Sequence, residues 1–410
     1  MLNWVQRFNI FCLLDNNSYN FRPNDYEYLL GAGSKAFISD AVASFDSVDT
    51  FLQGKQWTFG HIAYDLGYSF QNLNPEKDNR LSFPQFFFFQ PQIVLFIQGA
   101  QLHIECSNAD EIYDEIMNSA EQTDTGFLNI PIQQKLTKRD YLQKIRALQA
   151  HIQRGDCYEI NFCQEFFAED VVIHPVAVFH ALNVISPNPF AALYKIDDRF
   201  LICASPERFL NKNGNKLLSQ PMKGTAKRVP GDEIADKQAF TDLGHSAKDR
   251  AENVMVVDMV RNDLSVICKE GTVQAEALFE VHSFPAVHQM VSAITGLVED
   301  DVPFSKIIRA TFPMGSMTGA PKKRVMQLID KYEEGSRGIF SGTVGCITPT
   351  GNFDFNVVIR SIIYNATNRY LSYQVGSGIT IYSDPEKEWE ECLLKGEGIK
   401  KVLTSASTFV

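Results

Sequence analysis

The amino-acid sequence predicts an α+β fold in which helices cover mainly antiparallel sheets. Apolar runs with the composition of β-strands arrive in clusters, and helical segments lie between the clusters instead of following each strand. The chain has 410 residues, of which 45% are hydrophobic and 21% charged, and this is the composition of an ordinary folded protein. A chain of this length exceeds a typical domain, so we expect two domains or one large domain carrying a smaller one.

Residues 1–130 are expected to form the smaller, strand-rich domain, and residues 131–410 the larger one. Residues 81–104 carry no formal charge, but two prolines interrupt them, so two strands are expected there instead of a membrane span. The polar stretch 118–140 follows and separates two regions that are richer in apolar side chains. We therefore expect a boundary near residue 130.

The larger region is expected to begin with a helix at residues 137–156. Thr137 has the side chain of an N-cap, and Tyr141, Ile145 and Leu148 recur at helical spacing. Further apolar runs predict strands at residues 157–167, 190–196, 199–210, 342–349, 355–365 and 369–381. Helices are predicted between these clusters, at residues 246–263, 321–334 and 384–403.

The charge balance is acidic, with 38 basic and 49 acidic side chains and a formal net charge of −11. No run of five like charges occurs, so general binding to nucleic acid or to an anionic membrane is not expected. The first residues lack the basic and apolar segments of a secretory signal, which favours the cytoplasm. The eight cysteines include no C-x-x-C pair, so reduced, buried thiols are expected.

Acidic side chains on two predicted helices are candidate metal ligands. Near the C-terminus Glu388, Glu391 and Lys395 share one helix face, although this helix taken alone favours an ordinary solvated face with a Glu391–Lys395 pair. Glu252 lies beside an apolar stripe, where an acid needs a partner or a metal unless it sits at the edge of the stripe. Carboxylates from separate helices suit Mg²⁺, which binds oxygen ligands and usually keeps several waters.

The stretch LLSQPMKGTAKRVP, residues 217–230, places Lys223 between an apolar run and Gly224-Thr225. Taken alone, these letters favour an exposed turn lysine, because lysine is mostly exposed in folded proteins. A reactive amine is the alternative, and other parts of the chain have to decide between the two.

Two further strings contain charged residues with candidate roles. Glu207 and Arg208, in CASPERFL, are either a general acid or base with its partner or a structural ion pair. Arg360 lies in a predicted apolar strand, so it needs a carboxylate partner, which either the protein or a ligand supplies. The small-residue loops GSMTGAPKKR and QVGSGIT allow backbone N–H groups to approach an anion.

Taken together and in this order, the strings resemble the chorismate-utilising enzymes, which include anthranilate synthase component I, aminodeoxychorismate synthase component I, isochorismate synthase and salicylate synthase. The resemblance runs from about residue 137 to 400, and WTFGHIAYDLGY resembles the family's smaller domain. It is carried by the strings GDCYEINFCQEF, ASPERFL, PMKGTAKR, DRAENVMVVDMVRNDL, FPMGSMTGAPKKRVMQLID, GIFSGTVG, GNFDFNVVIRSI and VGSGITIYSDPEKEWEECLLKGEGI. It implies the family's α+β fold, a β-sandwich of mainly antiparallel sheets with helices on the outside.

The resemblance also implies roles for individual residues. Glu252 and Glu388 would bind Mg²⁺, with Glu391 nearby, and Glu207 would be the general acid or base. Lys223 resembles the lysine of aminodeoxychorismate synthases, where anthranilate synthases typically have alanine, and would be a nucleophile that attacks chorismate. The expected contacts to substrate come from Thr225, Thr318, Gly319, Arg360, Gly376, Gly378 and Lys395.

The implied reaction replaces the C4 hydroxyl of chorismate by an amine. The Lys223 amine must be neutral to attack, and we expect burial beside cationic groups to lower its pKa. The chain shows no glutaminase motif and no fused lyase, so we expect ammonia from a separate glutamine amidotransferase subunit and a downstream aminodeoxychorismate lyase as a separate protein. The alternatives are anthranilate synthase component I and a non-catalytic chorismate-binding subunit.

Three residues depart from the family pattern. Glu159 stands where relatives commonly have Gln or Lys, Phe340 where many have Tyr, and Gln289 where His is common. An extra acid at Glu159 is expected to change proton handling near the ring. Separately, the string FCLLDNNSY lies where regulatory relatives place part of an effector site, and the sequence leaves open whether tryptophan binds there.

Overall fold

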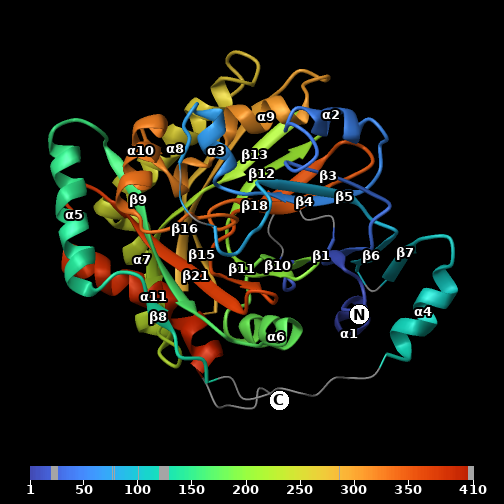
Figure 1. Cartoon of the computed structure of the whole chain (residues 1–410). Coiled ribbons are helices and arrows are strands. Elements are labelled where there is room, and N and C mark those ends of the chain that lie inside the picture. Colours follow the sequence, from blue (N-terminus) through green and yellow to red (C-terminus); the bar gives the residue numbers. More distant parts are fainter. Residues whose placement is uncertain are drawn as a thin grey trace.

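The computed structural model describes residues 1–19, 26–75, 77, 79–99, 101–119, 129–285 and 287–404. Two antiparallel sheets face each other, and most helices lie around their outside (Figure 1). Cys12, Ala192 and Leu201 from one sheet share a buried cluster with Phe59 and Phe89 from the other. The predicted α+β sandwich is therefore confirmed.

The first sheet has eleven strands in the described residues, in the order β17-β9-β21-β20-β11-β10-β1-β2-β6-β7, with β8 beside β9. Its strands are β1 (Ile10–Asp15), β2 (Tyr28–Ala32), β6 (Ile93–Gln98), β7 (Gln101–Glu105), β8 (Gln133–Gln134), β9 (Glu159–Ala168), β10 (Phe190–Ile196), β11 (Arg199–Ser205), β17 (Gly319–Ala320), β20 (Ser361–Asn365) and β21 (Tyr370–Ile379).

The second sheet has ten strands in the same part of the chain, in the order β14-β16-β13-β12-β19-β18-β4-β5-β3, with β15 also beside β16. Its strands are β3 (Ala36–Ser39), β4 (Thr58–Ile62), β5 (Phe86–Gln90), β12 (Arg208–Asn213), β13 (Lys216–Gln220), β14 (Met222–Lys227), β15 (Gln274–Ser283), β16 (Val287–Leu297), β18 (Thr343–Ile347) and β19 (Phe353–Asn356).

Some helices begin at a residue whose side chain caps them, and others begin without a side-chain cap. Thr137 Oγ1 accepts a hydrogen bond from the backbone N–H of Asp140, and Asp384 Oδ1 accepts one from Glu386 N at the start of the last helix. The helices are α1 (Leu2–Val5), α2 (Ser47–Leu52), α3 (Leu66–Phe70), α4 (Ala109–Met117), α5 (Lys138–Gln153), α6 (Pro175–Ile185), α7 (Glu233–His245), α8 (Ala247–Ser265), α9 (Phe304–Thr311), the 3₁₀ turn η1 (Gly315–Met317), α10 (Lys322–Tyr332) and α11 (Pro385–Thr404).

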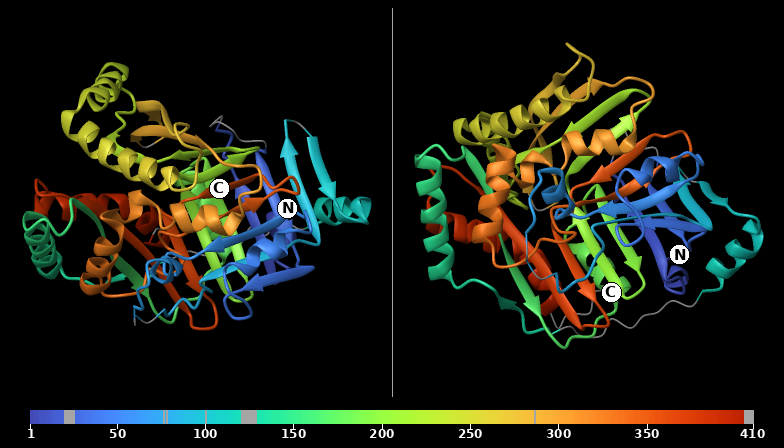
Figure 2. Two further views of the ribbon diagram at one scale, coloured as in Figure 1. Left: turned by 90° about the horizontal axis from the view of Figure 1, so that it is seen from above. Right: turned by 45° about the horizontal axis from the view of Figure 1, so that its top comes forward.

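The two helices that carry the candidate metal ligands approach one end of the molecule from opposite sides. Helix α8 packs on β14 and β16 of the second sheet, and α11 packs on β21 of the first. In Figure 2 the yellow α7 and α8 lie on one side and the red α11, with the green α5, on the other. Acids on α8 and α11 are therefore presented toward a shared region between the sheets.

Two strands that the sequence predicts as continuous are each broken in the structure. The run 199–210 divides into β11 and β12 at Pro206-Glu207, and the run 355–365 contains the end of β19 and all of β20. In both places the chain crosses from one sheet to the other. The crossings lie side by side, because Val357 N donates to Glu207 O (3.0 Å) and Ala204 N donates to Arg360 O (3.2 Å).

The regions before and after residue 130 share both sheets. Strand β1 pairs with β10 in the first sheet, and β4 pairs with β18 in the second. Part of the polar stretch around the expected boundary, residues 120–128, lies outside the described residues. The division into domains 1–130 and 131–410 stays a prediction, and the sheets themselves run across it. Among the described helices, none has the length and apolar character that crossing a membrane requires.

Candidate active site

Lys223 is paired with a carboxylate at the centre of the candidate site. On β14 its Nζ donates a hydrogen bond to Glu159 Oε1 at 2.7 Å, at the start of β9, so the pair joins the two sheets. The side chains are 15% and 4% exposed. Gly378 on β21 gives them room, since a Cβ there would lie 2.1 Å from Lys223 Nζ and 2.4 Å from Glu159 Oε1. The exposed turn lysine that the letters alone favoured is therefore wrong.

The electrostatic environment of Lys223 differs from the prediction. Burial acts to lower the pKa of the amine, but the negative charges of Glu159, Glu252 and Glu391 outweigh it and raise the pKa above its usual value. The expected lowering by cationic neighbours is wrong, because carboxylates face the amine. Lys223 therefore carries a proton that must leave before the nitrogen can attack.

Glu207 lies at the crossing between β11 and β12 and is buried. Its Oε1 accepts a hydrogen bond from Ser316 Oγ at 2.7 Å. Burial raises the pKa of its carboxyl to about 7, against the lowering effects of Ser316, Lys223 and Arg360. A carboxyl group that titrates near neutrality is suited to donate and accept protons.

Arg208 does not pair with Glu207, although the sequence left that open. Its guanidinium binds Asp354 on β19, with Nη2 to Oδ2 at 2.8 Å. Glu207 directly precedes β12 and Arg208 is its first residue. Because successive residues of a strand point to opposite faces, their side chains point in different directions. Arg208 therefore belongs to the second sheet's structure.

Arg360 does not lie within a strand, contrary to the prediction. It follows β19 in the crossing to β20 and has a φ of 50°, in the left-handed region that side chains other than glycine rarely adopt. Burial lowers the pKa of its guanidinium, and Glu207 raises it. Within the described residues the guanidinium makes no hydrogen bond or ion pair of its own. Its donors thus remain available to an anion.

The three candidate metal ligands come from α8 and α11. Burial raises the pKa of Glu252, and the ammonium of Lys248 lies 3.8 Å from its Oε1. Glu391 forms an ion pair with Lys395 at 2.8 Å, which lowers its pKa, and it also faces Lys223. Glu388 is 6% exposed, and its Oε2 is buried without a hydrogen-bond partner in the described part of the chain.

Across the described ranges, no three His, Cys, Asp or Glu side chains come close enough together to form a metal-binding group. The donor set nevertheless suits Mg²⁺, because one carboxylate oxygen of Glu388 is unused and Mg²⁺ usually takes only one or two protein carboxylates with waters and substrate. Glu252 and Glu388 as ligands, with Glu391 nearby, stay a prediction.

The remaining predicted substrate contacts border the same region. Lys395 Nζ donates to the carbonyl of Gly376 on β21 (3.0 Å), and a Cβ at Gly319 would lie 2.1 Å from the carbonyl oxygen of Glu159. Thr318 uses its hydroxyl to bind Met314 O at 2.8 Å. These residues therefore surround the Lys223–Glu159 pair, and their contacts to substrate stay a prediction.

The structure shows what each of the three residues that depart from the family pattern contacts. Gln289 accepts a hydrogen bond from Thr225 Oγ1 (3.0 Å) and donates one to Gly224 O (2.7 Å), so it holds the part of β14 directly after Lys223. Phe340 is buried in the core between the sheets. Glu159, noted only as a departure, is the direct partner of Lys223.

Ser316 was missed as an individual site residue. The loop GSMTGAPKKR is expected to use its backbone N–H groups, whereas a side chain in that loop contacts Glu207. A serine inside a small-residue loop resembles an ordinary turn residue in sequence, so only the fold shows its partner.

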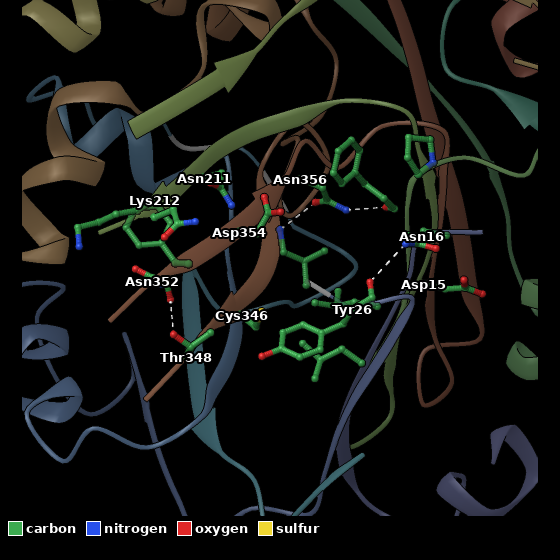
Figure 3. Close-up of a pocket in the computed structure, with 18 residues that line it drawn as sticks. Asp15, Asn16, Tyr26, Asn211, Lys212, Cys346, Thr348, Asn352, Asp354 and Asn356 are labelled. Carbon is green, nitrogen blue, oxygen red and sulfur yellow. Dashed lines mark hydrogen bonds between the residues drawn. The ribbon is translucent and has the colours of Figure 1, made fainter. Parts of the chain in front are cut away.

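A separate cavity of about 100 Å³ lies between the sheets, away from Lys223 (Figure 3). Leu14, Asp15 and Asn16 of the string FCLLDNNSY line it, together with Lys212 and Asp354. None of the predicted catalytic, metal or substrate-binding residues is among its lining residues. Binding of an effector in this cavity stays untested.

Comparison with curated proteins supports the sequence resemblance. The chain is 34% identical over 336 residues to "Aminodeoxychorismate synthase component 1" of Salmonella typhimurium, covering 81% of this chain and 73% of that protein. It is also 34% identical over 349 residues to the protein of the same name from Escherichia coli, covering 84% and 76%. These are relatives over most of both chains.

Comparison with solved structures supports the fold. Anthranilate synthase component I from Streptococcus pneumoniae TIGR4 aligns with a TM-score of 0.81 at 21% identity, covering 94% of both chains. The menaquinone-specific isochorismate synthase from Escherichia coli aligns with a TM-score of 0.79 at 18% identity, covering 98% of this chain and 91% of that one. The family model described as chorismate binding enzyme matches residues 23–401. The chain therefore belongs to the chorismate-binding enzymes.

Proposed function

We propose that this chain aminates chorismate at C4 to give 4-amino-4-deoxychorismate, in the cytoplasm, on the route to para-aminobenzoate and folate. The observation that supports this most directly is the buried Lys223 amine, held 2.7 Å from Glu159 over Gly378, with Glu207 nearby. A buried amine with a carboxylate that can take its proton and a second acid nearby suits a nucleophile that forms and breaks a C–N bond. The relatives named aminodeoxychorismate synthase component 1 support the same reaction.

The first half-reaction uses Lys223 and both acids. The ammonium of Lys223 passes a proton to Glu159 Oε1, which lies 2.7 Å away, and the neutral amine then bonds to C2 of the ring. The C4–O bond breaks as Glu207 donates its proton, so that water leaves. A carboxyl with a pKa of about 7 holds that proton through much of the neutral range.

The second half-reaction restores Lys223. Ammonia bonds to C4, the C2–N bond breaks, and lysine leaves as a neutral amine that takes its proton back from Glu159. The carboxylate of Glu207 then takes up a proton from the new C4 ammonium, so the net change is a C4 hydroxyl replaced by an amine. Arg360, whose guanidinium has no ion-pair partner among the described residues, would bind a substrate carboxylate.

Glu252 and Glu388 would hold Mg²⁺, with Glu391 beside them. When bound, the ion supplies neutralisation of a substrate carboxylate and polarisation of the ring. The ammonia would come from a separate glutamine amidotransferase subunit, as the words "component 1" in the relatives' names suggest. A separate lyase would convert the product to para-aminobenzoate.

The product made from chorismate, Mg²⁺ and ammonium tests the proposal. We expect 4-amino-4-deoxychorismate, detected as para-aminobenzoate after a purified lyase is added. Anthranilate as the main product, seen by its fluorescence, would contradict C4 amination and support the anthranilate synthase alternative. No turnover of chorismate under any of these conditions would support a non-catalytic binding subunit.

Variants of Lys223 test its covalent role. Lys223→Ala should lose most C4 amination, by about 10² or more, while chorismate still binds. Mass spectrometry of the quenched parent enzyme should find a chorismate-derived adduct on Lys223. Unchanged amination by Lys223→Ala would overturn the covalent mechanism.

A further inference from the structure

Arg337 is fully buried in the turn after α10, and protein atoms take all five of its N–H donors. Nε and Nη2 bind the two carboxylate oxygens of Glu333 at 2.9 and 2.6 Å. Nη2 also donates to Asn161 O (2.8 Å), and Nη1 donates to Met317 O (2.7 Å) and Ser341 Oγ (3.3 Å). Because every N–H donor is satisfied, Arg337 and the groups that accept its hydrogen bonds form a rigid junction.

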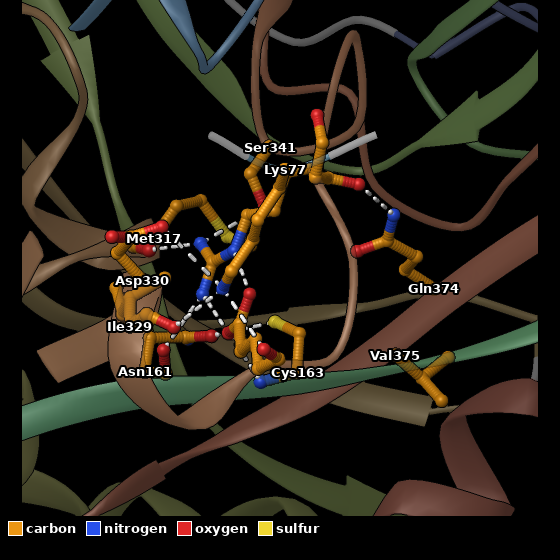
Figure 4. Close-up of polar contacts among 12 residues, drawn as sticks. Lys77, Asn161, Cys163, Met317, Ile329, Asp330, Ser341, Gln374 and Val375 are labelled. Atoms are coloured by element: carbon orange, nitrogen blue, oxygen red, sulfur yellow. Dashed lines mark hydrogen bonds and ion pairs between the residues drawn. The ribbon is translucent and has the colours of Figure 1, made fainter. Parts of the chain in front are cut away.

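This junction joins segments that are distant in the sequence (Figure 4). Asn161 is on β9, Met317 is in η1, and the Arg337 guanidinium also lies 4.5 Å from the ring centre of Tyr64. Glu333 Oε1 accepts a further hydrogen bond from Cys163 N at 2.9 Å. The Arg337–Glu333 ion pair therefore fixes η1 against β9. Neither of its side chains contacts Lys223 or Glu207.

The contacts of η1 and β9 continue to Glu207. Asn161 N donates to Thr318 O (2.7 Å), and Asn161 Nδ2 donates to Ser316 O (3.0 Å). Between them, Arg337 and Asn161 hold the carbonyl groups of three successive residues, 316 to 318. The hydroxyl of Ser316, at the start of this run, donates to Glu207 Oε1 at 2.7 Å.

We propose that Arg337 is a positioning residue for Glu207, acting through Met317 and Asn161 on the hydroxyl of Ser316. The proposal rests on the acid role given above to Glu207. A hydrogen bond from Ser316 favours the ionised carboxylate, so its geometry decides how readily Glu207 releases its proton. Besides Ser316, Glu207 faces Lys223 from β14 and Arg360 from the β19–β20 crossing, and both of these charges remain in the variants below.

The titration of Glu207 is measured directly by infrared difference spectroscopy. Its protonated carboxyl band is identified by its loss in Glu207→Gln, and it is followed against pH without substrate. Ser316→Ala should move the Glu207 titration to higher pH, by about one pH unit, because the donor to the carboxylate is lost. Arg337→Lys keeps the charge but cannot reach both carbonyl groups, so the titration should move in the same direction.

The double variant separates a relay from two independent effects. If Arg337 acts through Ser316, Arg337→Lys combined with Ser316→Ala should titrate like Ser316→Ala alone. If Arg337→Lys does not fold, Asn161→Ala takes its place, because it removes the bond to Ser316 O. The only other side-chain bond lost among the described residues is the one that Cys163 Sγ donates to Asn161 Oδ1 (3.2 Å). Tyr194→Phe is the matched control: it removes a buried hydrogen bond to His61 (3.0 Å) that has no contact with η1.

The same variants are then assayed with chorismate and ammonium. We expect kcat to fall about tenfold in Ser316→Ala with little change in KM. The alkaline limb of the profile of kcat against pH should move with the Glu207 titration that infrared spectroscopy measures. An unchanged Glu207 titration in Arg337→Lys, or in Asn161→Ala if that variant is needed, would overturn the proposal. Absence of amination by the parent protein would instead overturn the proposed function, and the infrared result would still decide the role of Arg337.

Discussion

At the scale of single residues, the 2.7 Å contact between Lys223 Nζ and Glu159 Oε1 sets the charge of the amine. The pKa of Lys223 is raised because carboxylates overcome the effect of burial. An amine with a raised pKa is protonated at neutral pH, and the neutral fraction grows as the pH rises toward that pKa. The pH at which Lys223 becomes neutral should therefore report the charge of Glu159.

Glu159→Gln should move this titration of Lys223 to lower pH. The amide keeps the shape of the side chain and removes its negative charge, so the pKa of Lys223 falls and the amine is neutral at lower pH. The measurement is the rate at which an amine-selective reagent modifies Lys223, followed against pH by mass spectrometry. Amination is not the readout, because it also depends on the lost proton acceptor.

Glu165→Gln is the control for this change, since Glu165 is a partly buried acid on the same strand and binds Tyr370 rather than Lys223. It should leave the titration of Lys223 in place. A titration that stays fixed or moves to higher pH in Glu159→Gln would show that Glu159 does not determine the protonation of Lys223.

Gly378→Ala should abolish most of the amination. A Cβ there would lie 2.1 Å from Lys223 Nζ and 2.4 Å from Glu159 Oε1, so both side chains would have to leave their positions. Misplacing a nucleophile by about 1 Å costs about 10² in rate. Gly398→Ala on α11 is the matched control, because its nearest neighbour would lie at 3.7 Å; equal activity of the two variants would refute this role for Gly378.

At the scale of elements, α8 and α11 each bring one buried or half-buried acid to the same region from different sheets. This arrangement predicts that Mg²⁺ stabilises the protein by joining the two helices. Mg²⁺ should raise the melting temperature of the parent protein, and Glu252→Gln and Glu388→Gln should lose most of that increase.

Glu390→Gln is the control for the metal prediction, because Glu390 is an exposed acid on the same helix as Glu388. It should keep the full Mg²⁺-dependent increase. Calorimetric titration with Mg²⁺ gives a second measurement, and equal affinity in the parent protein and in Glu388→Gln would remove Glu388 from the site.

Elements with a local signal were predicted well from the sequence. The cap at Thr137 and the buried Tyr141, Ile145 and Leu148 define α5, and the proline and acids of the last helix define the start of α11. Helix α7 was missed because Leu243 is its one buried residue, so it has no apolar stripe to detect.

Features that depend on the meeting of distant segments were not predictable. The breaks at Glu207 and Arg360 arise because the chain changes sheets there, and an apolar run carries no signal of which sheet receives it. The partner of Lys223 lies 64 residues away on β9, and its identity reversed the expected direction of the pKa shift. The resemblance to a family identified the region of the candidate site. The contacts between its side chains could be seen only in the folded structure.

At the scale of the whole molecule, the N-terminal strands complete both sheets. Strands β1 and β4 pair with β10 and β18, so removing residues 1–130 would expose two long sheet edges and part of the core. We expect one cooperative unfolding transition for the full chain, and no cooperative transition for residues 131–410 alone. Circular dichroism during thermal unfolding measures both, and two resolved transitions would support separate domains.

The paired crossings at Glu207 and Arg360 also restrict where residues can be inserted into the chain or deleted from it. Each crossing is a short span between strands whose partners in both sheets are fixed by hydrogen bonds. One inserted or deleted residue would turn every following side chain of β12 or β20 to the opposite face. Insertions should therefore be tolerated in the turn between β12 and β13 or the turn near Gly351, and excluded from the few residues that carry the acid and the arginine.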